Sequence, residues 1–220
     1  MFHEKKLSHK FLLVKFREMV CIMKGMKRPY QLKRRAESQD RTRQKIVDAA
    51  IELHQAKGIA ATSMGDIAEA AGVGKVTVYR HFADEAALVG ACSGQYFHRH
   101  PLPDIEAWRE VADAAERLRR GLHETYRYHR ETEAMMARVL PEARGLPIMA
   151  PYDDHWRRAA EILTEPWPAK GRAGALLRAA IALALSFDSW RLLVRGQGLS
   201  DRQAADLMMR LAGDCPPGGE

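Results

Sequence analysis

The sequence has few of the residues that disulfide, metal or redox chemistry requires. Three cysteines occur in 220 residues, Cys21, Cys92 and Cys215, and they form no CxxC pair. The histidine pairs at 98 and 100 and at 123 and 129 lack the i, i+4 spacing with which two imidazoles on one helix bind one metal. The sequence contains no P-loop, GxGxxG or GxSxG motif. We therefore expect no metal, no cofactor and no enzymatic activity, and reduced thiols in a cytoplasmic protein.

Long apolar runs and strand-like alternation are also missing. The apolar run at residues 11–14 is flanked by Lys10 and Lys15, so it is too short for a membrane span and lacks the cleavage site of a signal peptide. Downstream, apolar residues recur with a helical period. The sequence predicts an all-α fold of about nine helices, at residues 41–57, 63–71, 75–81, 84–98, 104–130, 132–143, 150–164, 172–196 and 201–212.

Positive charge is distributed unevenly along the chain. There are 35 Lys and Arg residues against 28 Asp and Glu, a formal net charge of +7. Residues 1–35 hold eleven basic and two acidic residues, whereas residues 36–220 sum to −2. Because the basic excess belongs to an N-terminal arm, the net charge by itself is a weak argument for a nucleic-acid-binding domain.

This arm, residues 1–39, admits three interpretations. Its segment at residues 24–35 is basic enough to follow DNA phosphates or enter a minor groove. Alternatively the arm is a solvated, disordered tail. In the third interpretation translation begins at Met23 or Met26, and the upstream residues are a gene-start artefact.

Residues 62–82 are the most informative segment, because they predict two short helices joined by a glycine-containing turn. The first of these helices carries an apolar stripe formed by Met64, Ile67, Ala68 and Ala71. Ser63 and Asp66 form a capping-box pattern at its start, and Gly72 fits a left-handed helix end. The second helix, residues 75–81, combines apolar anchors with hydrogen-bonding side chains. This pattern is typical of a helix-turn-helix, and we name residues 75–81 the recognition helix.

A wider set of residues surrounds this helix-turn-helix: Gly58, Thr62, Ile67, Ala68, Ala71, Gly72, Val73, Tyr79, Phe82 and Leu88. By these residues the chain resembles, over residues 41–91, the TetR family of bacterial transcriptional regulators. The resemblance implies a three-helix DNA-binding domain at residues 40–98, followed by a helical effector-binding and dimerisation domain at residues 99–220. One position departs from the family pattern, because Glu85 stands where a phosphate-binding Lys is usual. A carboxylate suits a helix N-terminus but repels the DNA backbone.

The candidate DNA contacts follow from the chemistry of each side chain. Lys75, Val76 and Thr77, at the start of the recognition helix, are expected to contact bases, with an apolar group available to a thymine methyl. Phosphate contacts are expected from Thr62, Ser63, Tyr79 and His81, and additional ones from Arg41, Arg43 and Lys45. Core packing is the alternative role of the Tyr79 ring.

The second domain contains apolar and aromatic residues that are suited to a ligand cavity. The candidates are Trp108, His123, Tyr126, Met136, Tyr152, Trp156 and Phe187. Each of them also fits an ordinary helical core, so the resemblance rather than the spacing favours a ligand.

Apolar residues at heptad spacing in the last two predicted helices indicate a partner helix. The predicted dimer seam comprises Leu183, Phe187, Trp190, Val194, Leu207 and Leu211. The alternative is that both stripes fill the core of the monomer. A dimer is favoured because a short recognition helix contacts few base pairs, and specific binding generally requires two half-sites.

The sequence thus predicts a dimeric, sequence-specific DNA-binding transcriptional regulator. We expect a repressor that an unknown small-molecule effector releases from a near-palindromic double-stranded DNA operator. Two alternatives stay open: a DNA-binding protein without an effector, and a helical ligand carrier or enzyme with a vestigial DNA module.

Overall fold

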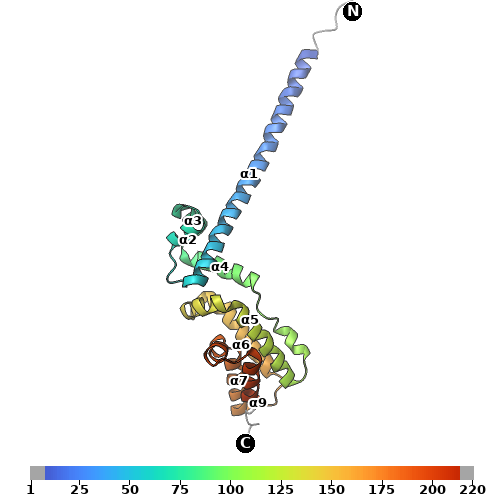
Figure 1. The fold of residues 1–220 in the computed structure, drawn as a ribbon. Helices are drawn as coiled ribbons and strands as arrows, with labels where there is room; N and C mark the ends of the chain where they lie inside the picture. The colour runs from blue at the N-terminus through green and yellow to red at the C-terminus, as the bar shows by residue number, and fades with distance from the viewer. Residues whose placement is uncertain (1–7, 214–220) are drawn as a thin grey trace, which may run out of the picture. The chain divides into compact units, whose positions relative to one another are not determined.

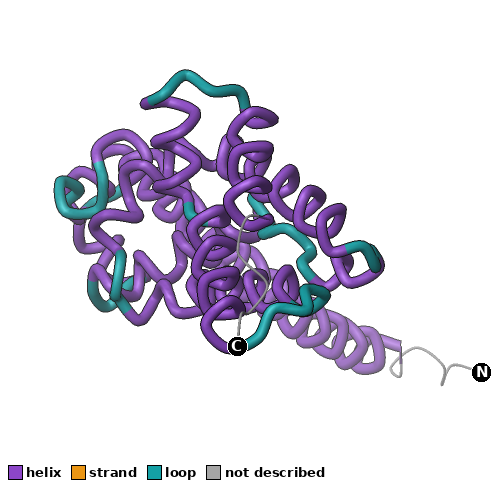
Figure 2. Tube along the Cα trace, turned by 90° about the horizontal axis from the view of Figure 1, so that it is seen from below, coloured by secondary structure: helices purple, strands orange, loops and turns teal. Residues whose placement is uncertain are grey.

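The computed structural model describes residues 8–213, and among the side chains before residue 33 it describes only that of Tyr30. Helices make up most of these residues, and no strand occurs among them (Figure 2). The all-α fold predicted from the periodicity is therefore confirmed. The chain divides into two compact units between residues 46 and 47.

The first helix, α1 (Ser8–Lys57), begins far upstream of the predicted start at residue 41 (Figure 1). The residues before Arg41 are rich in Lys, Arg and Gln, which have high helix propensity and extend the helix. In the first unit the Arg34 guanidinium lies 5.8 Å from the centre of the Tyr30 ring. The N-terminal arm is therefore helical from Ser8 onwards, and its residues 1–7 lie outside the described part.

Three short helices follow α1: α2 (Met64–Ala70), α3 (Lys75–His81) and α4 (Glu85–Arg99). The predicted capping box is confirmed, because the Ser63 hydroxyl accepts from the Asp66 amide while the Asp66 carboxylate accepts from the Ser63 amide. Gly72 has a φ of 66°, as the predicted left-handed helix end requires. The buried apolar side chains of these helices and their caps are Met64, Ile67, Ala68, Val78, Phe82, Leu88, Cys92 and Tyr96.

Polar contacts join α4 to the last turns of α1 within the second unit. The Asp48 carboxylate accepts hydrogen bonds from Gln95 Nε2 and Arg99 Nη2, both at 2.6 Å. The thiol of Cys92 is buried, with its Sγ 3.8 Å from the Val47 carbonyl oxygen. These contacts hold α4 against residues 47–57, so the end of α1 belongs to the helix-turn-helix module.

The helical domain begins with a short 3-10 helix, η1 (Glu106–Glu110), and the long helix α5 (Ala114–Ala143). Two predicted boundaries are therefore wrong. Asp113 caps α5 by accepting from the Glu116 amide, which separates it from η1 inside the predicted helix 104–130. The predicted break near residue 131 is absent because Thr132 donates its hydroxyl hydrogen to the Tyr128 carbonyl and fits within the helix.

A second 3-10 turn, η2 (Pro147–Met149), leads into α6 (Ala150–Thr164), whose bounds match the prediction. Then come α7 (Gly171–Leu185), α8 (Phe187–Arg191), a π-helical turn η3 (Leu192–Gly196) and α9 (Asp201–Gly213). Helices α5, α6, α7 and α9 pack in one bundle (Figure 1). Arg130 of α5 joins α9 through two hydrogen bonds of 2.7 Å to the Asp201 carboxylate.

The predicted single helix 172–196 is wrong, because Ser186 leaves the helical conformation with a ψ of 132°. This break changes which side chains face outward. Leu183 before it is 49% exposed, whereas Phe187, Trp190 and Val194 after it are buried. The predicted heptad seam is therefore divided into an outward part and a core part.

No helix in the described residues 8–213 is both long enough and apolar enough to span a membrane.

Candidate nucleic-acid interface and ligand cleft

The loop between α1 and α2 is fixed by hydrogen bonds of its own residues. Thr62 Oγ1 donates to the Gly58 carbonyl at 2.6 Å, and Lys57 Nζ donates to the Asp66 carboxylate at 2.7 Å. The Lys57 ammonium and the Ser63 amide hold the pKa of Asp66 at about 2. The Thr62 hydroxyl hydrogen is thus used inside the fold, and the Ser63 hydroxyl accepts from the Asp66 amide and also interacts with the Asp66 carboxylate.

The recognition helix, α3, has one buried side and one exposed side. Val78 is fully buried and Phe82 nearly so, which anchors the helix. Lys75 is exposed, Thr77 is half-buried, Val76 is 81% exposed and Tyr79 is 46% exposed. A short helix with an exposed valine beside an exposed lysine presents both an apolar and a cationic contact to an outside partner.

The other candidate DNA contacts differ in their exposure to solvent. His81 is half-buried and its Nε2 atom is enclosed with no hydrogen-bond partner among the described residues. Arg41, Arg43 and Lys45 are exposed on α1 in the first unit. Glu85 is the first residue of α4, where Asp84 caps the helix by accepting from the Ala87 amide at 2.8 Å. Glu85 therefore complements the helix dipole rather than offering a phosphate contact.

Sequence analysis missed Glu142, which lies near the end of α5 but binds the α1–α2 loop. Its Oε2 accepts from the Ile59 amide at 2.7 Å and from the Ala60 amide at 2.8 Å. Successive backbone amides of this kind form a small anion-binding concavity. The two segments are more than 80 residues apart, so no local pattern predicts this contact.

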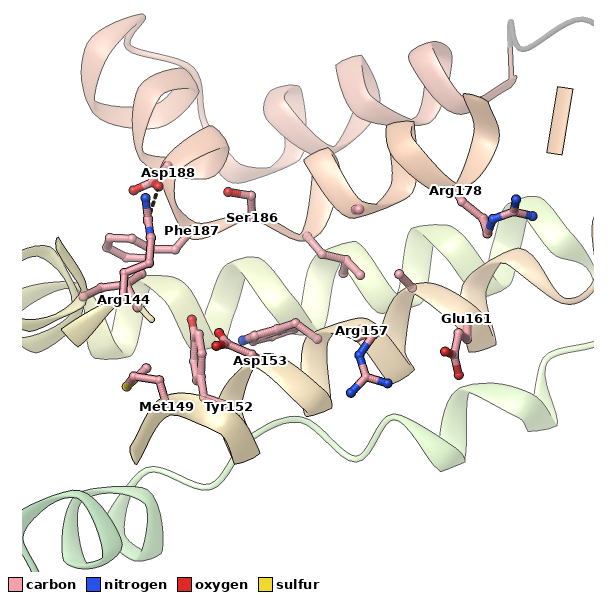
Figure 3. A pocket seen from close by; sticks show the side chains of 15 residues that line it. Arg144, Met149, Tyr152, Asp153, Arg157, Glu161, Arg178, Ser186, Phe187 and Asp188 are labelled. Carbon is pink, nitrogen blue, oxygen red and sulfur yellow. Dashed lines mark hydrogen bonds and ion pairs between the residues drawn. The ribbon is translucent and has the colours of Figure 1, made fainter. Parts of the chain in front are cut away.

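An open cleft of about 500 Å³ lies in the helical domain between the end of α5, α6, α7 and the start of α8 (Figure 3). Its lining residues include Leu140, Met149, Tyr152, Trp156 and Phe187, which form an apolar and aromatic wall. The volume is in the range of small-molecule sites.

Charged side chains surround this apolar wall. At one end of the cleft Arg144 donates to Asp188 at 2.5 Å, shown as a dashed line in Figure 3. Arg178 and Glu161 lie toward the opposite end of the cleft (Figure 3). The Arg144–Asp188 pair joins the residue after α5 to α8 across one end of the cleft.

The structure brings only some of the predicted pocket residues together. Tyr152, Trp156 and Phe187 line the cleft, whereas His123 is exposed on α5. Met136 lines a separate apolar cavity of about 40 Å³. Trp108 and Tyr126 are fully buried and do not line the cleft; the Trp108 indole donates to Glu124 at 2.6 Å. For Trp108 and Tyr126 the structure therefore supports a role in the core.

A second residue that the sequence did not single out is His129, which is fully buried on α5. Its Nε2 lies 2.9 Å from the Leu185 carbonyl, which is the last of α7 before the break at Ser186. A carbonyl only accepts, so Nε2 carries the hydrogen. Burial lowers the pKa of His129 to about 4, and the ring is neutral near pH 7. The centre of the imidazole ring lies within 5.7 Å of the ring centres of Trp156, Phe187 and Trp190. Because Trp156 and Phe187 line the cleft, His129 packs directly behind the cleft wall.

Four leucines of α7 and α9 are exposed although the helices are packed against each other. They are Leu176, Leu183, Leu207 and Leu211, each between 45% and 49% exposed. Of the predicted dimer seam, Leu183, Leu207 and Leu211 are therefore on the surface, and Phe187, Trp190 and Val194 are in the core.

Comparison with known proteins identifies the N-terminal module. The sequence profile of bacterial regulatory proteins of the tetR family matches residues 46–92. The HTH-type transcriptional regulator AcrR of Shigella flexneri is 31% identical over 138 residues, which cover 55% of this chain and 63% of AcrR. The regulator TtgR of Pseudomonas putida is 36% identical over 69 residues, covering 31% of this chain and 33% of TtgR. The chain thus spans less than two thirds of these curated relatives.

The three-dimensional fold is also similar to that of a TetR-like regulator. The structure of a TetR-like transcriptional regulator from Rhodococcus sp. RHA1 superposes with a TM-score of 0.53 at 23% identity, and the match covers 78% of this chain and 93% of that protein. The likeness therefore extends from the helix-turn-helix into the helical domain. Residues 46–92 thus match the tetR family of bacterial regulatory proteins, and the described helices have a TetR-like fold.

Proposed function

We propose that the protein is a sequence-specific DNA-binding transcriptional regulator. The observation that carries the proposal is the recognition helix, in which Lys75, Val76 and Tyr79 are exposed while Val78 is buried. Such a helix offers its N-terminal residues to base edges in a major groove and its phenol to a phosphate. The relatives AcrR and TtgR are named HTH-type transcriptional regulators, which supports the same role.

The proposed DNA-binding form is a homodimer. Its interface would be formed by the exposed leucines of the neighbouring helices α7 and α9, since apolar side chains grouped on a surface are typical of protein interfaces. Pairing these two helices with the same helices of a second copy buries that surface around a two-fold axis. The symmetry places two recognition helices on the half-sites of a near-palindromic operator, one helical turn or a multiple apart.

We further propose that a small molecule in the cleft releases the protein, a repressor, from its operator. The cleft combines an aromatic wall with charged ends, as ligand sites do. An effector acts only through its different affinities for the DNA-bound and the released conformers. A coupling of about 1 to 3 kcal/mol changes operator affinity by roughly 5- to 150-fold.

Binding selection from a random duplex pool, followed by mobility-shift titration, tests the proposal. Lys75→Ala should weaken binding to the selected duplex by about tenfold or more, because one lysine contact is lost. Lys170→Ala removes an exposed lysine of the helical domain and serves as the matched control, with unchanged affinity expected.

Two outcomes would favour the alternatives. If Lys75→Ala binds as tightly as the parent, α3 is not the recognition helix. If the parent selects no duplex from the pool, the helical ligand carrier or enzyme with a vestigial DNA module becomes the better explanation.

A further inference from the structure

We propose that the last turn of α5 is the element that transmits occupancy of the cleft to the helix-turn-helix, and that Glu142 is its positioning residue. This inference rests on the proposed function, since it concerns how the cleft regulates DNA binding. It assigns a role to the contact between Glu142 and the Ile59 and Ala60 amides.

One turn of helix participates in both regions. Leu140 and Arg144 line the cleft, and Arg144 binds Asp188 at its end. Glu142, between them in sequence, binds the α1–α2 loop instead. A displacement of this turn by an occupant of the cleft therefore also displaces the carboxylate that holds the loop.

The turn is weakly held to the rest of its helix. Pro141 lies inside α5 and has no amide hydrogen, so one hydrogen bond of the helix is missing immediately before Glu142. Gly145, with a φ of 82°, follows Arg144 and ends the segment. A segment between a proline and a left-handed glycine can shift without moving the central part of α5.

The apolar cavity of about 40 Å³ provides space for such a shift. Leu140 and Met149 line both this cavity and the cleft, and the cavity also reaches Ile59 of the α1–α2 loop. An occupant that presses Leu140 or Met149 from the cleft side moves them toward an unfilled volume rather than into packed atoms. The cavity thus connects the cleft wall to the loop that Glu142 holds.

The loop in turn determines how α2 and α3 are presented. Thr62 binds the Gly58 carbonyl, and Ser63 then caps α2, so only a few residues separate the Glu142 contact from the helix-turn-helix. When Glu142 is withdrawn, the Ile59 and Ala60 amides lose their acceptor, and only the loop's internal hydrogen bonds, such as Thr62 to Gly58, still hold it. The geometry of the recognition helix becomes less well defined, and operator affinity falls.

The test replaces the unidentified ligand by a side chain that fills the cleft. Ala160→Trp introduces an indole from α6 into the cleft, and Ala182→Phe does so from α7 as a second, independent variant. NMR hydrogen exchange at the Ile59 and Ala60 amides is measured without DNA, and operator affinity is measured by titration. Each filling variant should speed exchange at these two amides and weaken operator binding by about tenfold.

Glu142→Ala should give the same two effects with an empty cleft, and Glu131→Ala, an exposed glutamate of the same helix, should give neither. The deciding measurement is the double variant. If Glu142 transmits the signal, Ala160→Trp has no further effect on exchange or affinity in the Glu142→Ala background.

Additive effects in the double variant would overturn the proposal, as would filled-cleft proteins whose Ile59 and Ala60 amides exchange at the parental rate. Failure of the proposed function looks different. In that case no duplex binds the parent, while the exchange measurements still report whether the cleft and the loop are coupled.

Discussion

At the scale of single residues, His129 shows how the interior of the helical domain depends on protonation. The ring donates to the Leu185 carbonyl, and its Nδ1 atom is buried with no partner among the described residues. Burial lowers the pKa of His129 from 6.5 to about 4, so protonation is strongly disfavoured while the domain is folded.

The expected consequence is a loss of stability in mild acid. Between pH 6.5 and 4 the unfolded chain binds a proton at His129 and the folded chain does not, so folding stability falls as the pH falls through this window. Urea unfolding should show a loss of about 2 kcal/mol between pH 7.5 and pH 5 from this residue alone.

Variants of two histidines on α5 separate this effect from general acid sensitivity. His129→Gln should flatten the pH dependence, and His123→Gln, at an exposed site, should leave it unchanged. Burial also lowers the pKa values of His54 and His155, so the free energy of unfolding of His129→Gln should still depend on pH to a smaller extent. An unchanged slope in His129→Gln would show that the buried ring does not control acid stability.

At the scale of elements, the α1–α2 loop depends on the backbone of Gly58. Its φ of 89° lies in the left-handed region, and a Cβ at this position would overlap the Glu142 carboxylate. The left-handed backbone favours glycine here, and a Cβ would in addition force the Glu142 carboxylate to move.

Gly58→Ala should lower the free energy of unfolding by roughly 1 to 2 kcal/mol, the cost of a left-handed alanine. Gly94→Ala is the matched control, since Gly94 lies in α4 with open space around it. There alanine should stabilise by roughly 0.5 to 1 kcal/mol. Chemical denaturation measures both, and equal effects at the two sites would contradict the role of the loop geometry.

The sequence predicted elements where the signals were local. The capping box at Ser63 marks the start of α2, and the proline at residue 151 marks that of α6, whose bounds match the prediction. The break at Ser186 was not predicted, because serine is neutral toward helices and the heptad spacing continues across it.

The candidate site was predictable only in part, for the same reason. Periodicity shows that Trp108, Tyr126 and Trp156 are apolar positions of helices, but it does not show which of them faces a cavity. Glu142 reads as an ordinary helix-surface carboxylate until the fold brings it to the Ile59 amide. Contacts between distant segments leave no periodic signal in either segment.

At the scale of the whole molecule, the exposed leucines of α7 and α9 predict self-association. Leu183→Glu and Leu207→Glu each place a carboxylate in the proposed apolar interface, where it has no partner. Sedimentation should show a dimer for the parent and a dissociation constant raised by roughly 100-fold or more in each variant.

Leu146→Glu is the matched control, because Leu146 is 47% exposed outside α7 and α9. It should sediment like the parent. A monomeric parent, or a control that dissociates as readily as the variants, would contradict the proposed dimer.

The interruption of the helix at Ser186 lets the residues before it and after it face different surroundings. Leu183, before it, points to solvent, and Phe187, after it, points into the cleft wall. In an uninterrupted helix residues 183 and 187, four positions apart, would lie on the same face. With the interruption, a substitution at residue 187 should change the wall of the proposed ligand cleft and leave the proposed leucine interface unchanged, so under the proposed function the choice of effector and the pairing of subunits can evolve independently.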